Sequence, residues 1–159
     1  MYAVDELDRV LEIFDLPQAS VAEPGPIVFS GRDSVCMAYV TQRSVNEGNG
    51  DEYAVVEFSG VRAHWCGAPG DGALAMHPLY PLGLEHYSFC EIIGSSLVRA
   101  LYRMYDDHPG QGGAFCGGSR HFVMTFRSTT FECVARDYAC VLRGGSEAEA
   151  IGTMRERLT

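Results

Sequence analysis

The sequence predicts an α+β domain, a mostly antiparallel β-sheet of five to seven strands with about three helices packed on it. Several short runs rich in β-branched and aromatic residues alternate apolar with polar side chains, as strands do. Three longer segments place apolar residues at helical spacing. Turn-forming residues separate these runs, and neither a linker nor an internal repeat divides the 159 residues. One domain over residues 1–159 is therefore expected.

Three helices follow from spacing and capping signals. The first spans residues 5–16, where four apolar residues share one helical face: Leu7, Val10, Leu11 and Phe14. Ser95 or Ser96 caps a second helix that runs to about residue 106. Ser146 and Glu149 have the spacing of a capping box, which predicts a third helix to about residue 158.

The other regular segments are expected to be strands, at residues 35–41, 53–58, 61–66, 86–93, 121–126, 131–135 and 138–143. The run at 61–66 should pair with the strand before it. Residues 44–52 have the composition of a hairpin loop, and 110–118 that of a mobile loop. The stretch at 67–83 is irregular and rich in glycine and proline, and loops of that length are often functional.

The strands at 121–126 and 131–135 give the sharpest expectation. With residues 127–130 as the connection, every large apolar side chain falls on one face, in three cross-strand pairs: Phe126 with Phe131, Met124 with Cys133, and Phe122 with Ala135. The other face carries His121 and Glu132, and Arg127 lies diagonal to Glu132. This face is either a solvated surface with one weak salt bridge or a pocket floor. In a pocket, His121 would act as acid or base and Arg127 would orient an anion.

The charge balance excludes several classes of partner. The net charge is −9, and all 12 basic residues are arginine. An acidic chain is a poor ligand for nucleic acid or for an anionic membrane surface, since both need a basic face. No run of about 20 apolar residues could form a transmembrane helix. Residues 1–16 lack the basic start and apolar run of a signal peptide, so a cytoplasmic location is expected.

Six cysteines are distributed along the chain: Cys36, Cys66, Cys90, Cys116, Cys133 and Cys140. None forms a C-x-x-C pair, which excludes a zinc ribbon and a thioredoxin-like motif. Most lie in apolar runs, where a free cysteine behaves as a small buried hydrophobe. Six reduced thiols and no disulfide are expected.

Motifs with a known mechanism are missing. The chain has no Walker A loop, no G-x-S-x-G elbow, no H-E-x-x-H and no EF-hand loop, and no cofactor is expected. No two histidines have the spacing of a ready metal site. His64, His77 and His108 remain weak candidates for a metal site assembled from distant loops. The prolines that follow His77 and His108 favour the alternative, in which both are structural turn residues.

A set of short segments carries a family resemblance. They are Val-Arg-Ala-His at 61–64, Ala-Pro-Gly-Asp at 68–71, His-Pro-Leu-Tyr at 77–80, His-Pro at 108–109, and His-Phe-Val-Met-Thr-Phe-Arg-Ser-Thr-Thr-Phe-Glu-Cys-Val-Ala at 121–135. This combination resembles a family of uncharacterised bacterial proteins that share an HFxxTFxxxTFECxA hairpin and upstream AH and HPLY segments. Members have a histidine and an aspartate at the positions of Arg127 and Ser128. The resemblance covers about half of the chain and implies no activity. It implies that five residues belong to one recurring pattern: His64, His77, His108, His121 and Glu132.

Two functions remain open from the sequence. The absence of a visible nucleophile–base pair favours a non-catalytic binding protein, immunity-like or regulatory, whose acidic surface meets a protein partner with a basic surface. The alternative is a small hydrolytic enzyme that uses loop histidines and the polar face of the 121–135 hairpin, with His121, Glu132 and His64 as catalytic candidates. Convergence of several histidines and Glu132 at one pocket would favour the enzyme. The oligomeric state is not indicated by any of these patterns.

Overall fold

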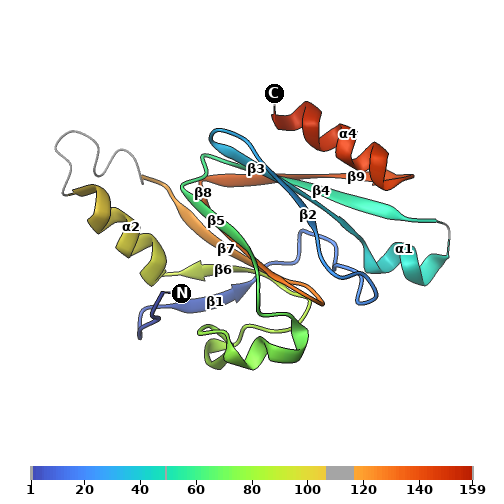
Figure 1. Ribbon diagram of the computed structural model, residues 1–159. Coiled ribbons are helices and arrows are strands. Elements are labelled where there is room, and N and C mark those ends of the chain that lie inside the picture. Colours follow the sequence, from blue (N-terminus) through green and yellow to red (C-terminus); the bar gives the residue numbers. More distant parts are fainter. Residues whose placement is uncertain (1, 49, 107–116, 159) are drawn as a thin grey trace.

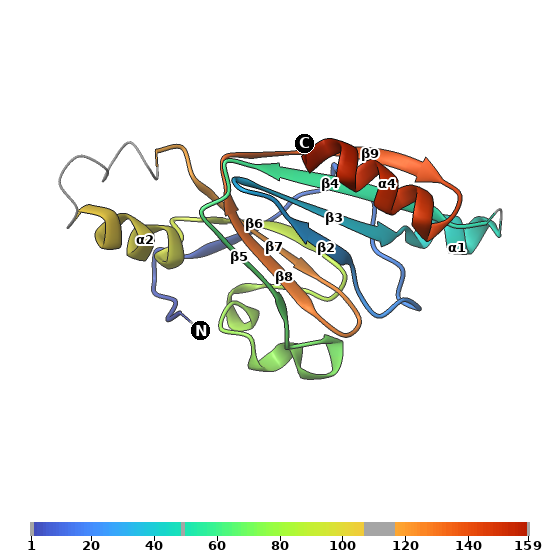
Figure 2. The same ribbon diagram turned by 45° about the horizontal axis from the view of Figure 1, so that its top comes forward.

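The chain folds as an α+β protein with two antiparallel sheets. The computed structural model describes residues 2–48, 50–106 and 117–158, and nine strands lie in these ranges. Five form one sheet in the order β1-β6-β7-β8-β5, with bounds Arg9–Glu12, Phe89–Ile93, Arg120–Thr125, Thr130–Ala135 and Ala63–Gly67. Four form the other in the order β2-β3-β4-β9, with bounds Ile27–Ser30, Ser34–Val40, Glu52–Ser59 and Asp137–Gly144. The strands of the two sheets cross each other (Figure 2).

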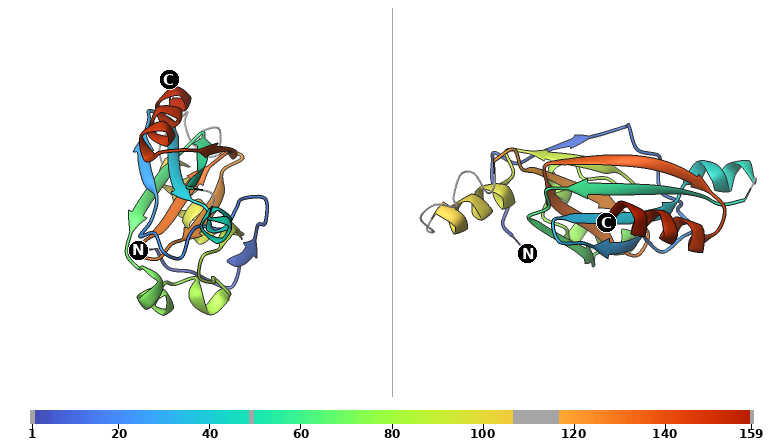
Figure 3. Two further views of the ribbon diagram at one scale, coloured as in Figure 1. Left: turned by 90° about the vertical axis from the view of Figure 1, so that its right-hand side faces the viewer. Right: turned by 90° about the horizontal axis from the view of Figure 1, so that it is seen from above.

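Helices cover the sheets on different sides instead of forming one layer. The α-helices of the described ranges are α1 (Gln42–Glu47), α2 (Ser96–Asp106) and α4 (Glu147–Leu158). Two 3-10 helices, η1 (Asp71–Met76) and η2 (Tyr80–Leu82), lie beneath the five-stranded sheet (Figure 1). Helix α4 lies across the four-stranded sheet (Figure 3), and α2 extends from one end of the five-stranded sheet. None of the described helices is both long enough and apolar enough to cross a membrane.

The main core lies between the sheets. Phe58 of β4 contacts the rings of Phe122 and Phe131 on the hairpin, with centroid distances of 5.7 and 5.3 Å. On the outer side of the four-stranded sheet, α4 buries Ala150 and Met154. On the outer side of the five-stranded sheet, Leu74 and Leu79 pack near Val123. This last cluster fixes the η1–η2 segment, which carries His77, against the sheet.

The hairpin has the predicted faces but a different register. Met124 lies opposite Phe131, and Thr125 lies opposite Thr130, a shift of two residues from the predicted pairing. A shift of two keeps each side chain on its own face, because side chains in a strand alternate with a period of two. The connection is therefore 126–129, closed by the Phe126 N–H donating to the Thr129 carbonyl at 2.8 Å. Thr130 is buried, whereas the sequence placed it in the connection.

The N-terminal helix predicted for residues 5–16 is wrong. The structure has strand β1 there, paired antiparallel with β6 so that Leu11 lies opposite Glu91. The helical spacing of the apolar residues therefore does not produce a buried face. Leu7, Leu11 and Phe14 are exposed at 55%, 53% and 82%.

Three further expectations change. Residues 44–52 are not a simple hairpin loop, because α1 begins after Thr41, whose side chain accepts the Ser44 N–H. Strand β5 does not pair with β4, the strand before it, but with β8, so it belongs to the five-stranded sheet. The stretch at 67–83 contains η1 and η2. Most of the loop expected at 110–118 lies outside the described residues.

The capping signal before the last helix is confirmed. The Ser146 N–H donates to Glu149 Oε2 at 2.7 Å, and the Glu149 N–H donates to Ser146 Oγ at 3.3 Å. Five cysteines lie in the described ranges as free thiols: Cys36, Cys66, Cys90, Cys133 and Cys140. Cys116 lies outside them.

Candidate functional site

The carboxylate of Glu132 is the centre of a buried polar cluster. Its Oε1 lies 2.6 Å from Nε2 of His77, and its Oε2 lies 2.7 Å from Nε2 of His121. The Tyr2 hydroxyl donates a third hydrogen bond to Oε2 at 2.8 Å. The side chains of Glu132, His77 and His121 are each exposed by 1% or less. A buried carboxylate with this many donors is satisfied as an anion.

The hairpin positions two members of this cluster. Glu132 lies opposite Val123, and His121 is two residues before Val123, so the two side chains are diagonal neighbours on one face. His77 comes from the segment between η1 and η2, which Leu74 and Leu79 anchor against the sheet. The structure thus brings together His121, Glu132 and His77, which lie up to 55 residues apart in the sequence.

Ser95 extends the cluster beyond the imidazole of His121. Its Oγ lies 2.8 Å from Nδ1 of His121 and accepts the Val98 N–H at 3.2 Å. With the Nε2 proton of His121 donated to Glu132, Nδ1 is left as the acceptor for the Ser95 hydroxyl proton. Ser95, His121 and Glu132 therefore form a continuous hydroxyl–imidazole–carboxylate chain, called here the Ser95–His121–Glu132 chain.

His77 has a fixed tautomer. The Leu79 N–H donates to its Nδ1 at 3.1 Å, so its remaining proton is on Nε2 and is donated to Glu132. Burial by itself would raise the pKa of the Glu132 carboxyl. The hydrogen bonds from His121 and His77 outweigh burial and bring that pKa below its ordinary value. Burial, followed by the charge of Glu132, raises the pKa of the Tyr2 hydroxyl, which remains a donor.

A sharp turn presents Ser95 at the start of α2. Strand β6 ends at Ile93, Gly94 has φ +69°, and α2 begins at Ser96. Only glycine suits position 94, because a Cβ there would collide with the Leu7 carbonyl oxygen. Ser95 thus caps the helix and lies at the positive end of its dipole.

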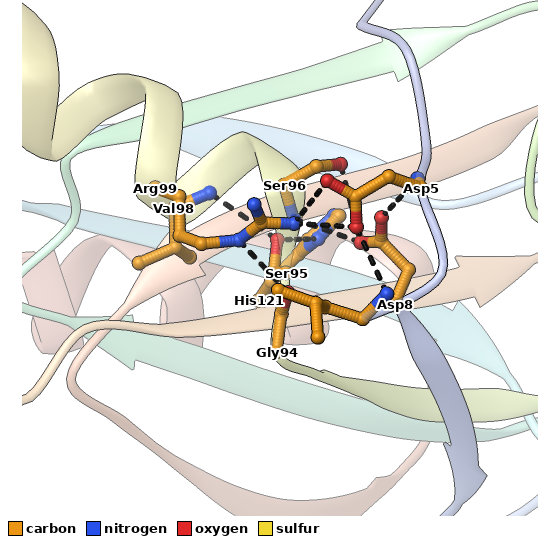
Figure 4. Close-up of polar contacts among 9 residues, drawn as sticks. Asp5, Asp8, Gly94, Ser95, Ser96, Val98, Arg99 and His121 are labelled. Atoms are coloured by element: carbon orange, nitrogen blue, oxygen red, sulfur yellow. Dashed lines mark hydrogen bonds and ion pairs between the residues drawn. The ribbon is translucent and has the colours of Figure 1, made fainter.

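The N-terminal segment clamps this turn (Figure 4). Asp8 Oδ1 accepts the Ser96 N–H at 2.8 Å, and its Oδ2 accepts the Asp5 N–H at 2.8 Å. One nitrogen of Arg99 lies 2.7 Å from both carboxylate oxygens of Asp5. These contacts hold residues 5–8, and with them Tyr2, close to the Ser95–His121–Glu132 chain.

Two cavities flank the cluster. One, of about 240 Å³, is lined by residues that include Ser95, Val98, Ser119 and His121. The other, of about 410 Å³, is lined by Tyr2, Trp65, Ala68 and Leu97. In the Ser95–His121–Glu132 chain, the hydroxyl and the imidazole therefore lie at a cavity wall, and the Glu132 carboxylate lies behind them.

Not every candidate residue joins this site. His64 lies opposite Cys133 on β5, on the face away from Glu132, and its Nε2 is 3.1 Å from Ser30 Oγ. Burial lowers the pKa of His64. The expected role of Arg127 beside Glu132 is wrong, since its guanidinium donates to the Ala22 carbonyl at 2.8 Å. His108 lies outside the described residues.

The histidines considered as weak metal ligands do not come together in the structure. His64 and His77 lie on opposite faces of the sheet, and both nitrogens of His77 have protein partners. Within residues 2–48, 50–106 and 117–158, no group of three or more His, Cys, Asp and Glu side chains is arranged to hold a metal ion.

Sequence reasoning missed Ser95 and Tyr2 as members of the site. Ser95 did leave a signal: Ile-Ile-Gly-Ser-Ser at 92–96 is a strand, a glycine turn and a helix cap in succession, which places a hydroxyl at a helix N-terminus. Tyr2 left none, because its place over Glu132 depends on the path of residues 2–8.

No protein-family model, curated protein or solved structure matches the chain. The chemistry of the site therefore rests on its geometry. A serine hydroxyl within hydrogen-bond distance of an imidazole that is backed by a carboxylate is the kind of arrangement that activates a serine nucleophile. Here the imidazole presents Nδ1 to the hydroxyl and Nε2 to the carboxylate.

Proposed function

We propose that the protein is a small hydrolase that cleaves a short-chain ester or a similarly activated acyl compound, with Ser95 as the nucleophile. One observation carries the proposal: Ser95 Oγ lies 2.8 Å from Nδ1 of His121, whose Nε2 lies 2.7 Å from Glu132. In this proposal Ser95 and His121 are the nucleophile and base, a pairing that the sequence alone did not indicate.

The reaction follows from the direction of the hydrogen bonds. Ser95 Oγ would attack the acyl carbon while its proton passes to Nδ1 of His121, and Glu132 would stabilise the imidazolium that forms. The leaving alcohol would take this proton, and water would then hydrolyse the acyl–serine ester with His121 again as base. The dipole of α2 favours the negative charge that develops near Ser95.

The cavity beside Ser95 suggests the size of the substrate. Its volume of about 240 Å³ is below the roughly 300–1,000 Å³ of pockets for drug-sized ligands. Ile92 and Val98 contribute apolar lining, and Ser119 contributes a hydroxyl. Ser119 Oγ is buried without a partner among the described residues, so it is available to a polar substrate atom. The small volume supports a short acyl group, and the unpartnered Ser119 hydroxyl offers it a polar contact.

Covalent labelling tests the proposal directly. The folded wild-type protein is treated with a fluorophosphonate and digested, and the modified residue is identified by mass spectrometry. Labelling is expected at Ser95 and should be lost in Ser95→Ala. Ser96→Ala is the matched control, because the Ser96 hydroxyl donates to Asp8 and not to a histidine. It should keep the label at Ser95.

Hydrolysis of p-nitrophenyl acetate and butyrate gives a second readout. Loss of the nucleophile or its base is expected to lower the rate by about 100-fold or more. An unmodified Ser95 in the folded protein, or equal hydrolysis by wild type and Ser95→Ala, would reject the hydrolase and leave the buried cluster with a structural role.

A second function, binding of a protein partner with a basic surface, has separate support. The chain has a net charge of −9. Its N-terminal segment exposes large apolar side chains at Leu7, Leu11 and Phe14. Several large apolar side chains exposed along one short segment are consistent with an interaction site. Leu7, Leu11 and Phe14 do not line the cavity at Ser95, although the Leu7 carbonyl lies beside Gly94 at the turn that presents Ser95, so the two functions are compatible.

A further inference from the structure

Strand β1 has a free edge. It is the end strand of its sheet, and it pairs only with β6 among the described strands. The Ile13 N–H donates to the Phe89 carbonyl at 2.7 Å, which marks residues 9, 11 and 13 as the hydrogen-bonded positions toward β6. The backbone groups of Val10 and Glu12 therefore face the other way. No backbone hydrogen bond from these groups to another described element is found.

This edge is only lightly protected. Proteins shield edge strands by shortness, charged side chains, a covering element, a bulge or proline. Strand β1 is short and carries the charged Arg9 and Glu12, but it contains no proline and no described strand pairs with its outer edge. Here Leu11 is more than half exposed on β1, and Leu7 and Phe14 flank the strand with exposed side chains. An open row of backbone groups with apolar neighbours is the template to which an extended peptide adds as a new strand.

Negative charge surrounds the same edge. Glu6, Glu12 and Asp15 are exposed along the N-terminal segment, and Arg9 is the one cation of β1. Glu85 lies near the same strand pair, because its carbonyl accepts the hydroxyl of Ser88, one residue before β6, and Glu12 lies opposite Cys90 on β6. An incoming strand with basic side chains would meet opposite charges here.

We propose that the free edge of β1 binds, by strand addition, an extended segment of another protein in which Lys or Arg alternates with apolar residues. The inference rests on the second proposed function, the binding of a basic partner, and is independent of the hydrolase. A second copy of this chain fits less well, because it would bring another net charge of −9 to the same edge.

A cavity at the C-terminal end of β1 suits the apolar positions of such a segment. It measures about 250 Å³ and is lined by residues that include Glu12, Phe14, Pro17 and Tyr87. An apolar side chain following the added strand could enter it, while a basic neighbour pairs with Glu12.

A library of ten-residue peptides that alternate Lys or Arg with an apolar residue provides the probe. Affinity for the full chain is measured by fluorescence anisotropy at low and high salt. The best binder is then made in two N-methylated forms, one blocked at odd positions and one at even positions. Strand addition uses the N–H groups of one set only, so one form should lose binding at least tenfold and the other should retain it.

Two protein variants locate the binding. Glu12→Lys should weaken it at least tenfold, whereas Glu147→Lys, which makes the same charge change on α4, should leave it nearly unchanged. If both N-methylated peptides bind equally well, and both protein variants change the affinity equally, the peptide binds elsewhere on the protein. This result would overturn strand addition at β1 but not the binding of a basic partner. No binding by any library peptide would overturn both. If the protein forms concentration-dependent dimers that Glu12→Lys disrupts, a second copy of the chain occupies the edge. This result would overturn the proposal that a basic segment of another protein binds there.

Discussion

Nε2 of His121 lies 2.7 Å from Oε2 of Glu132, across a diagonal of the β7–β8 hairpin, and neither side chain is exposed. The same carboxylate accepts hydrogen bonds from His77 and Tyr2. Glu132 therefore joins three segments that are distant in sequence: the hairpin, the η1–η2 segment and the N-terminus. Stability and the proposed chemistry both depend on this one buried anion.

Glu132→Gln should destabilise the fold strongly. The substitution keeps the size of the side chain but replaces an acceptor facing two imidazoles with an amide. Breaking a buried charged network in this way costs about 3–5 kcal/mol. The control is Glu57→Gln, which removes a partly exposed pair with Arg157 at 3.0 Å and should cost less than about 1 kcal/mol. Urea unfolding at pH 7 measures both, and similar losses would contradict a central role for Glu132.

The contribution of Glu132 should disappear in acid. Its pKa is lowered in the folded protein, because the hydrogen bonds from His121 and His77 outweigh burial. In the window between the folded pKa and the unfolded value of about 4.3, the unfolded chain binds the extra proton. The stabilisation is therefore complete above that window and is lost as the pH falls through it.

The difference between wild type and Glu132→Gln isolates this effect. Other acids with lowered pKa values, such as Asp5 and Glu149, are present in both proteins. The gap in unfolding free energy should be constant near neutral pH and should shrink below about pH 4. A gap that stays constant down to pH 3 would show that Glu132 is not held as an anion.

The alternation of apolar and polar residues predicted which side chains of the hairpin share a face, because successive side chains of a strand point to opposite faces. It could not predict the register, since shifts of two residues preserve the same faces and only the turn distinguishes them. The Phe126 N–H bond to the Thr129 carbonyl sets that turn. His121 and Glu132 were predicted on one polar face for the same reason. Their burial depends on η1, η2 and Tyr2, whose positions have no local signal.

The N-terminal segment shows where helical spacing misleads. Leu7, Leu11 and Phe14 are spaced for a helix, yet the segment is held extended by pairing with β6 and by Asp8, which accepts the Ser96 N–H. These are long-range contacts, and they override local propensity. Ser95 is one of the two helix caps that the sequence predicts, but its bond to His121 joins residues 26 positions apart and has no local signal.

Substitutions in the hairpin test the observed register. Phe126→Ala and Phe131→Ala should each cost about 3–5 kcal/mol, because both rings are buried between the sheets. Thr130→Ala should cost about 1–3 kcal/mol, since it removes a buried hydroxyl that donates to the Pro69 carbonyl at 2.8 Å. Ser128→Ala, in the exposed part of the turn, should change stability by less than about 0.5 kcal/mol. A larger loss at Ser128 than at Thr130 in urea melts would favour the register predicted from the sequence.

The cysteines should titrate as six free thiols in freshly purified, denatured protein. The five described cysteines are unpaired, and Cys66 alone among them is exposed. In the native state, Cys66 should react with Ellman's reagent at pH 8 faster than the buried thiols, because its side chain is exposed, even though burial raises the pKa of its thiol. Cys133 should not react, because burial raises the pKa of its thiol to about 12 and blocks access. Cys66→Ser should remove one equivalent from the fast phase and leave the slow thiols unchanged. A total below six without exposure to air would reveal a disulfide, and fast labelling of Cys133 would contradict the packing of the hairpin against β4.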